Sequence, residues 1–137
     1  MTPFIDGSVV YGANVELMSE LRTFTDGLLV SSRSADGREL LPVDRMLKDG
    51  CNQAEEAAKG RYCFKSGDAR ANENLHLTTL HLILARQHNK VAAILKAKHP
   101  NWSDEILFQE SRKIVAAQMQ HIHYNEFLPI VLGKNYC

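Results

Sequence analysis

The sequence predicts a mainly α-helical fold in which two long antiparallel helices follow a short helix and a small hairpin. Two observations support this class. One stripe of apolar residues at helical spacing follows Asn74, and a second follows Ser103. Only the proline-containing connector HPNWSDE separates the two stripes, and a connector this short favours antiparallel neighbours. Strand is a minor component of the expected fold.

A short helix is expected first, over residues 13–24. Asn14 can cap its N-terminus, because an asparagine side chain accepts a hydrogen bond from a backbone N–H in the first turn. Leu17 and Leu21 are spaced so that they share one helix face. This segment can therefore pack against the longer helices.

A hairpin is expected within residues 27–42, where two extended pieces flank the turn signal Asp36-Gly37. Residues 43–67 are polar and predict an irregular surface loop. Cys51 and Cys63 bracket the stretch CNQAEEAAKGRYC in that loop, and by spacing alone they could form a bridge or remain two unrelated thiols. A bridge would indicate an oxidising compartment.

The two long helices carry the expected core. The apolar stripe of the first consists of Leu77, Leu80, Leu84, Val91 and Leu95. Pro100 stops that helix, and Ser103 can cap the next one. The second helix is expected to end at Leu128, because a residue that precedes proline is pushed out of the α region.

Composition limits the classes of partner. The chain has 137 residues and a net charge of zero, from 16 basic and 16 acidic residues. This balance argues against nucleic acid or an anionic membrane as the main partner, since both favour a basic surface. The apolar runs fall short of the roughly 20 residues that span a bilayer, so no membrane span is expected.

The stretch TPFIDGS near the N-terminus is a candidate calcium site. In an extended chain alternate residues share one side, which would place Thr2, Phe4, Asp6 and Ser8 together. Hydroxyl, carboxylate and backbone carbonyl oxygens are hard donors that suit calcium. One carboxylate is few for a divalent cation, so further ligands must come from elsewhere. The alternative is a capped turn before a helix or strand.

The stretch SGDARANE is the second candidate site. Arg70 lies near the N-terminus of the first long helix, and its fork of donors can hold an anion or a developing oxyanion. Glu73, three residues on, can reach the same space. The alternative is a solvated charged loop.

The six histidines do not show the spacing of a zinc site, so the sequence predicts that they serve packing or surface hydrogen bonding. They are His76, His81, His88, His99, His121 and His123.

Three ordered segments resemble the animal haem peroxidases. They are TPFIDGSVVYG (2–12), FKSGDARANENLHLTTLHLILARQHNKVA (64–92) and WSDEILFQESRKIVAAQMQHIHYNEFLPIVLG (102–133). The resemblance implies that residues 1–137 are a slice of the mostly helical peroxidase domain. Its parts would be a calcium loop (2–12), a loop with a disulfide (43–67), a distal helix segment (68–98) and the helix after it (103–127).

The resemblance also implies roles for single residues. Arg70 matches the family's distal catalytic arginine, which polarises the O–O bond of hydrogen peroxide. Glu73 matches the glutamate that forms an ester to a haem methyl in several members, and Asn74 stands where some members have a haem-linked methionine. Cys51 and Cys63 match a family disulfide. The calcium ligands of the family match Thr2, Phe4 through its carbonyl, Asp6 and Ser8.

The implied parent is a secreted enzyme with haem b and calcium, which reduces hydrogen peroxide and oxidises halide, phenolic or protein substrates. The family's distal and proximal histidines have no match in this chain, so the segment alone is expected to be inactive and to need the remainder of the parent chain. The alternative is a non-catalytic helical module for binding or adhesion, derived from a haem peroxidase.

Overall fold

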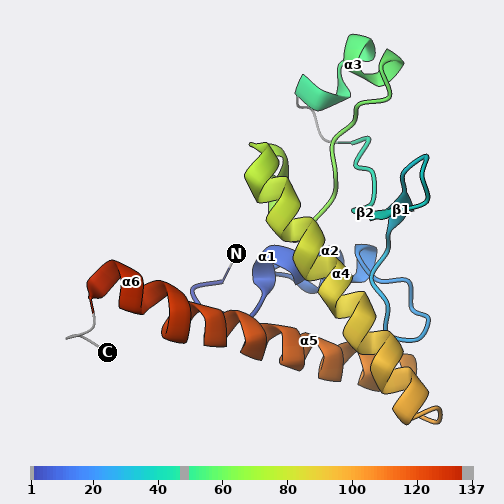
Figure 1. Ribbon diagram of the computed structural model, residues 1–137. Coiled ribbons are helices and arrows are strands. Elements are labelled where there is room, and N and C mark those ends of the chain that lie inside the picture. The colour runs from blue at the N-terminus through green and yellow to red at the C-terminus, as the bar shows by residue number, and fades with distance from the viewer. Residues whose placement is uncertain (1, 47–49, 134–137) are drawn as a thin grey trace.

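The computed structural model describes residues 2–46 and 50–133 and confirms the mainly helical class. Two long helices dominate it, α4 (Leu75–Lys98) and α5 (Asp104–Ile122). They meet beside the connector and diverge from it as the arms of a V (Figure 1). Cys137 lies outside the described residues.

Ser103 caps α5 as expected, and Asn74, for which the sequence analysis predicted no cap, caps α4. The Asn74 side chain accepts a hydrogen bond from the backbone N–H of Leu77 at 3.0 Å, and Ser103 Oγ accepts from the N–H of Ile106 at 3.4 Å. Asp104 lies in the first turn of α5, where the helix dipole favours a negative charge. Local capping chemistry therefore determines where both helices begin.

The predicted end of the second long helix is wrong. The backbone continues from α5 through a π-helical turn, η3 (His123–Phe127), into α6 (Leu128–Leu132). Pro129 falls in the first turn of α6, where the missing N–H of proline is tolerated. The wider turn resets the hydrogen-bonding pattern before the proline, and the helical path ends at Gly133 with φ 82°.

The N-terminal half contains shorter elements than expected. Helix α1 (Ser8–Tyr11) precedes α2 (Val15–Glu20), which covers only part of residues 13–24. Asn14 does cap α2, because its side chain accepts from the N–H of Leu17 at 2.9 Å. The chain then leaves the helix for a loop.

The hairpin is confirmed, but it is small. Strand β1 (Ser32–Arg33) pairs antiparallel with β2 (Glu39–Leu40), with Ser32 opposite Leu40 across the turn that contains Gly37. The loop predicted over 43–67 is not wholly irregular. It includes the 3₁₀ turn η1 (Gly50–Asn52) and the helix α3 (Ala54–Ala58), and both stand apart from the long helices (Figure 1).

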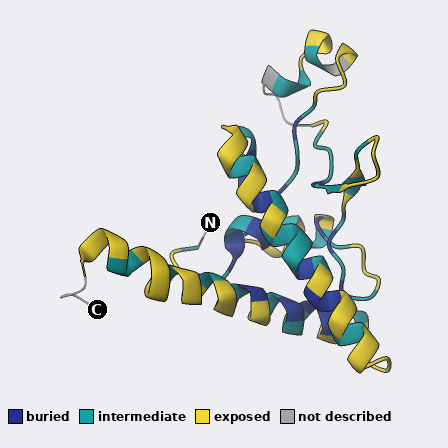
Figure 2. Ribbon diagram, in the orientation of Figure 1, coloured by how far each residue is buried: buried dark blue, intermediate teal, exposed yellow. Residues whose placement is uncertain are grey.

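The core lies where α1 and α2 pack against the middle of α4 and the first half of α5. Its buried cluster comprises Val10, Tyr11, Leu21, Leu29, Phe108 and Val115. Figure 2 shows the buried residues gathered at this junction, while the second half of α5, η3 and α6 are largely exposed. Ile122, Phe127 and Ile130 are among the large apolar side chains that remain open there. Among the described residues, the helices fall short of the length and apolar character needed to cross a bilayer.

Candidate functional site

The four predicted calcium ligands do gather, although not along an extended strand. Residues 3–7 form a series of bends that closes onto α1, so the extended geometry expected for this stretch is wrong. Thr2 Oγ1 lies 3.3 Å from Ser8 Oγ and 3.4 Å from the carbonyl oxygen of Phe4. Asp6 Oδ1 accepts a hydrogen bond from the backbone N–H of Ser8 at 2.9 Å.

The loop's oxygens suit a hard cation. Burial tends to raise the pKa of Asp6, but hydrogen bonds from the Ser8 backbone and from the hydroxyls of Thr2 and Ser8 outweigh it and hold that pKa below its usual range. The carboxylate is therefore ionised at neutral pH. The Phe4 side chain is exposed, so only its backbone carbonyl can serve the site.

The donors are of the right kind for calcium, but they are too few to fill its shell. Calcium takes six to eight oxygen ligands, and this loop supplies one carboxylate, two hydroxyls and a carbonyl. Within residues 2–46 and 50–133, no three carboxylate, imidazole or thiol side chains gather closely enough to hold a metal. Further oxygen ligands must therefore come from outside this segment or from water.

The candidate arginine is held by an aspartate that the sequence reasoning missed. Arg70 lies in the 3₁₀ turn η2 (Ala69–Asn72), and Asp68 caps that turn by accepting from the Arg70 N–H at 2.9 Å. The same carboxylate accepts from Arg70 Nε at 3.2 Å and from Nη2 at 3.0 Å. An aspartate two residues before the arginine, at a helix start, was the available signal.

Asp68 holds the Arg70 guanidinium in place from a nearly buried position. The Asp68 side chain is 10% exposed, whereas the Arg70 side chain is 60% exposed. Hydrogen bonds from the Arg70 side chain, with help from its backbone N–H and its charge, hold the pKa of Asp68 below its usual range, although burial opposes this shift. The hydrogen bond and charge of Asp68 raise the pKa of Arg70 in turn. The pair therefore stays ionised, with the guanidinium presented outward.

Glu73 lies at the end of the same turn. Its backbone N–H donates to the Arg70 carbonyl at 2.9 Å, and its side chain is exposed. The negative charge of Glu73 also contributes to raising the pKa of Arg70. Both predicted side chains therefore lie on one turn just before α4.

The calcium-type loop (residues 2–12) is in close backbone contact with the residues that lead into η2, the turn that carries Arg70 and is called the arginine turn below. Ser66 Oγ donates to the carbonyl of Val9 at 3.2 Å. A Cβ placed on Gly67 would lie 2.3 Å from the Gly12 nitrogen and 2.5 Å from the Ser8 carbonyl oxygen. Only glycine permits this approach, so the SGD sequence joins α1 to η2. The sequence reasoning did not find this contact.

A buried histidine connects the same region to the rest of the core. Tyr11 Oη lies 2.9 Å from His88 Nδ1, and His88 Nε2 lies 2.8 Å from the Gly27 carbonyl oxygen. His88 is fully buried, which confirms the packing role expected for it. The carbonyl can only accept, so Nε2 carries the proton and Nδ1 accepts from the tyrosine.

The bridge between Cys51 and Cys63 is present, with their Cα atoms 5.2 Å apart. It closes the loop that holds η1 and α3, far along the chain from the calcium-type loop.

Comparison with known proteins gives the family of this mainly helical chain. The family model for animal haem peroxidase matches residues 1–137. Chorion peroxidase of Drosophila melanogaster is 50% identical over 97% of this chain, and human myeloperoxidase is 44% identical over 97%. The structure of peroxidase A from Dictyostelium discoideum superposes with a TM-score of 0.80 over 92% of this chain, at 32% identity. The chain belongs to the animal haem peroxidase family.

The chain spans only a small part of these relatives. It covers 16% of the Drosophila chorion peroxidase, 18% of human myeloperoxidase and 24% of the Dictyostelium structure.

Proposed function

We propose that this chain is a segment of a haem-dependent peroxidase that reduces hydrogen peroxide and oxidises halide, phenolic or protein substrates. Its similarity to named peroxidases over nearly its whole length supports this function. The structural observation that carries it is the pairing of Arg70 with Asp68, which fixes a permanent positive charge on an exposed turn. When bound, the haem group supplies the redox chemistry of its iron.

Arg70 is the proposed catalytic residue of this segment. Its guanidinium would donate hydrogen bonds to the peroxide and stabilise the negative charge that develops as the O–O bond breaks. Such stabilisation requires donors that are oriented before the reaction. Asp68 meets this requirement, because it fixes Nε and Nη2 and so sets the plane of the guanidinium.

Glu73 is the proposed attachment point for the haem. Its carboxylate is exposed on the turn that carries Arg70, which leaves it accessible to a planar group that approaches that turn. An ester between this carboxylate and a haem methyl would fix the haem relative to Arg70. Asn74 has no thioether sulfur, so it offers no haem link of the methionine type.

A calcium ion is the second proposed ligand. Thr2, the carbonyl of Phe4, Asp6 and Ser8 would hold it, together with ligands from outside the segment. The ion would stabilise α1. Because Gly67 contacts the backbone of α1, a stabilised α1 would also hold the arginine turn in place. The ion therefore has a structural role in this proposal.

The parent enzyme is proposed to act outside the cell. The disulfide between Cys51 and Cys63 supports this location, because such bonds persist in oxidising compartments.

The test is the variant Arg70→Gln in the complete peroxidase domain, with Arg38→Gln as the matched control. Arg38 is exposed and pairs only with local groups on the hairpin. The rate of reaction with hydrogen peroxide, followed by stopped-flow absorbance of the haem, is expected to fall at least 100-fold in Arg70→Gln, which is about the cost of one lost oxyanion donor. It should stay unchanged in Arg38→Gln. Equal rates in the two variants would remove the role assigned to Arg70.

A further inference from the structure

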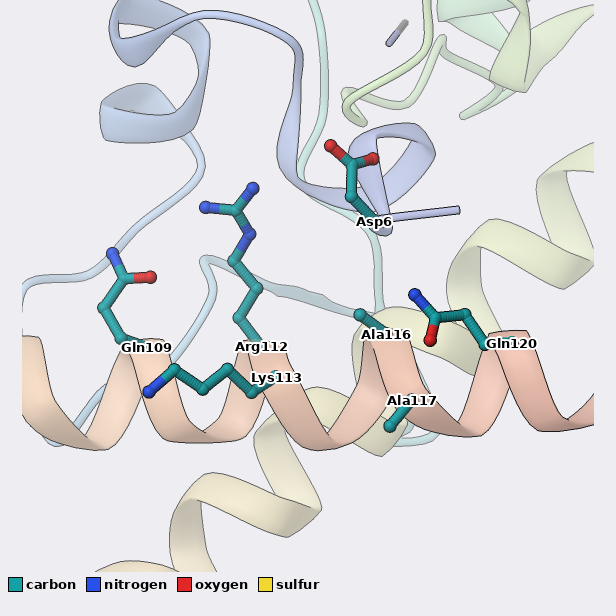
Figure 3. A pocket seen from close by; sticks show the side chains of 7 residues that line it. All are labelled: Asp6, Gln109, Arg112, Lys113, Ala116, Ala117 and Gln120. Atoms are coloured by element: carbon teal, nitrogen blue, oxygen red, sulfur yellow. The ribbon is translucent and has the colours of Figure 1, made fainter. Parts of the chain in front are cut away.

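A cavity of about 360 Å³ lies between the calcium-type loop and α5. Asp6 lines it from the loop, and Gln109, Arg112, Lys113 and Gln120 line it from the helix. Figure 3 shows Arg112 rising from α5 towards the level of Asp6, which the loop holds above the helix. None of these α5 residues belongs to the site described above.

Most of the polar groups around the cavity already have partners. Lys113 Nζ pairs with Glu110 at 2.6 Å. The Gln109 amide donates to Glu105 at 2.8 Å, and the Gln120 amide donates to the carbonyl of Ile5 at 2.8 Å. Three of the four polar α5 side chains are thus oriented by contacts of their own.

Arg112 differs from its neighbours. Its Nη1 lies 3.9 Å from the thioether sulfur of Met18, and its Cζ lies 5.6 Å from the centre of the Tyr11 ring. Within the described residues Arg112 forms no ion pair, while Arg22, Arg38, Arg61 and Arg70 each do. Arg112 is half-buried, and among the described residues it contacts a sulfur and an aromatic face, which leaves most of its five donors free to bind a group that enters the cavity.

We propose that this cavity receives a carboxylate side chain from the part of the peroxidase polypeptide that lies outside this segment, and that Arg112 binds it through two parallel hydrogen bonds. The inference rests on the proposed function, because it requires the complete domain. The planar guanidinium fork matches a carboxylate, which can accept both bonds at once. The cavity therefore defines a docking point for an acidic residue.

Two arguments favour a tethered carboxylate over a free small anion. An isolated, partly exposed ion pair contributes little free energy, so a free carboxylate would bind weakly. A side chain of the same polypeptide has a high effective concentration and avoids most of that cost. The chain also covers only 16% of the Drosophila chorion peroxidase and 18% of human myeloperoxidase, so much polypeptide of such relatives lies outside it.

The test is zero-length cross-linking of the variant Arg112→Lys in the complete domain, with a carbodiimide. The reagent activates a carboxylate as an O-acylisourea, the amine introduced at position 112 displaces the urea, and an amide bond forms. Peptide mass spectrometry is expected to find a new link from position 112 to an Asp or Glu outside this segment. The native pair Lys113 and Glu110 is the internal control, because it should cross-link in both proteins.

A link from position 112 only to Asp6 or to other residues of this segment, or no link while the control forms, would overturn the inference. If the variant does not fold, modification of the wild-type protein by phenylglyoxal decides. Arg112 should react in the 137-residue chain and be protected in the complete domain, and equal reaction in both would overturn the inference. Haem absorbance and peroxide turnover are measured in parallel. Their persistence without the cross-link would reject this inference and leave the proposed function intact.

Discussion

Tyr11 Oη and His88 Nδ1 lie 2.9 Å apart in the centre of the core, although 77 positions separate the two residues in the chain. Phe108 packs against both rings, with centroids 5.9 Å from Tyr11 and 5.3 Å from His88. Through this contact and the bond to Gly27, one imidazole joins α1, α4 and the loop after α2. His88 therefore holds together the scaffold behind the calcium-type loop.

Acid should destabilise the fold through this histidine. Burial lowers the pKa of His88 from 6.5 to about 4, with the Arg22 charge adding to the shift and the bond to Gly27 opposing it. The unfolded chain therefore takes up the proton first. The stabilisation is complete above about pH 6.5 and is lost as the pH falls towards 4, by up to about 3 kcal/mol.

Urea unfolding of the chain at a series of pH values between 4 and 7.5 measures this dependence, with His88→Asn as the matched variant. The asparagine oxygen can accept from Tyr11 Oη, but the side chain does not titrate. The free energy of unfolding should depend less steeply on pH in the variant. Identical slopes in the two proteins would contradict the assignment of a buried neutral His88.

Of the charged side chains near the surface, Arg22 should cause the largest loss of unfolding free energy when it is removed. It bonds Asp104 at 2.8 Å and Glu105 at 2.6 Å, and its Cζ lies 4.0 Å from the centre of the Phe108 ring. Asp104 also accepts from the Gly27 N–H at 2.6 Å, so the charges link the start of α5 to the loop after α2.

The variant Arg22→Met keeps most of the side-chain volume and removes the charge. We expect it to lose about 1–3 kcal/mol of unfolding free energy, because Asp104, whose side chain is 24% exposed, loses a charged hydrogen-bond partner, while Glu105 is 60% exposed and is solvated by water. Denaturant unfolding measures the change. Arg38→Met is the control, since the Arg38 side chain is 75% exposed and its loss should leave stability unchanged. Equal stability of the two variants would refute this role of Arg22.

Local chemistry was the predictable part of the fold. Asn14 and Ser103 were identified as caps because a cap depends on residues only three positions away. The end of α5 was not predicted, because a π-helical turn and an ordinary turn of helix have the same apolar pattern. Periodicity cannot distinguish them.

The contacts around the candidate site residues were not predictable from the sequence. Thr2, Asp6 and Ser8 were grouped on the assumption of an extended strand, and they meet instead through bends. Asp68 was missed because its signal, an aspartate at the start of a helical turn two residues before the arginine, was not applied to this short turn. The approach of Gly67 to Gly12 joins segments 55 positions apart by the numbering, and a single sequence carries no signal for such a pair.

Loss of the disulfide should loosen one loop and leave the helical core unchanged. The bridge between Cys51 and Cys63 closes a loop with a sequence separation of 12, for which chain entropy predicts about 3 kcal/mol. Asn52 also stabilises this loop. Its side-chain amide donates a hydrogen bond to the Asp44 carbonyl at 2.6 Å, and its side-chain oxygen accepts one from the Cys63 N–H at 3.1 Å.

Hydrogen exchange of the paired variant Cys51→Ser with Cys63→Ser tests this prediction. Amides of α3 and its flanks should exchange faster, because α3 makes its contacts with η1 and stands apart from the long helices (Figure 1). Amides in the middle of α4 and α5 should keep their protection. A matching loss of protection in α5 would show that the loop supports the core.

The variant Asp6→Asn removes the charge of Asp6 with little change in shape, and so tests the role of that charge in the calcium-type loop. The asparagine oxygen can still accept the hydrogen bond from the Ser8 N–H, so the start of α1 keeps its cap. The variant removes the one carboxylate that the loop contributes, and carboxylate charge is a main determinant of calcium affinity. We expect calcium affinity of the complete domain, measured by calorimetric titration, to fall at least tenfold. Asp36→Asn, on the exposed hairpin turn, should bind calcium as the wild type does. If both variants bind alike, the cation does not use Asp6, and the oxygens around Ser8 serve only to cap α1.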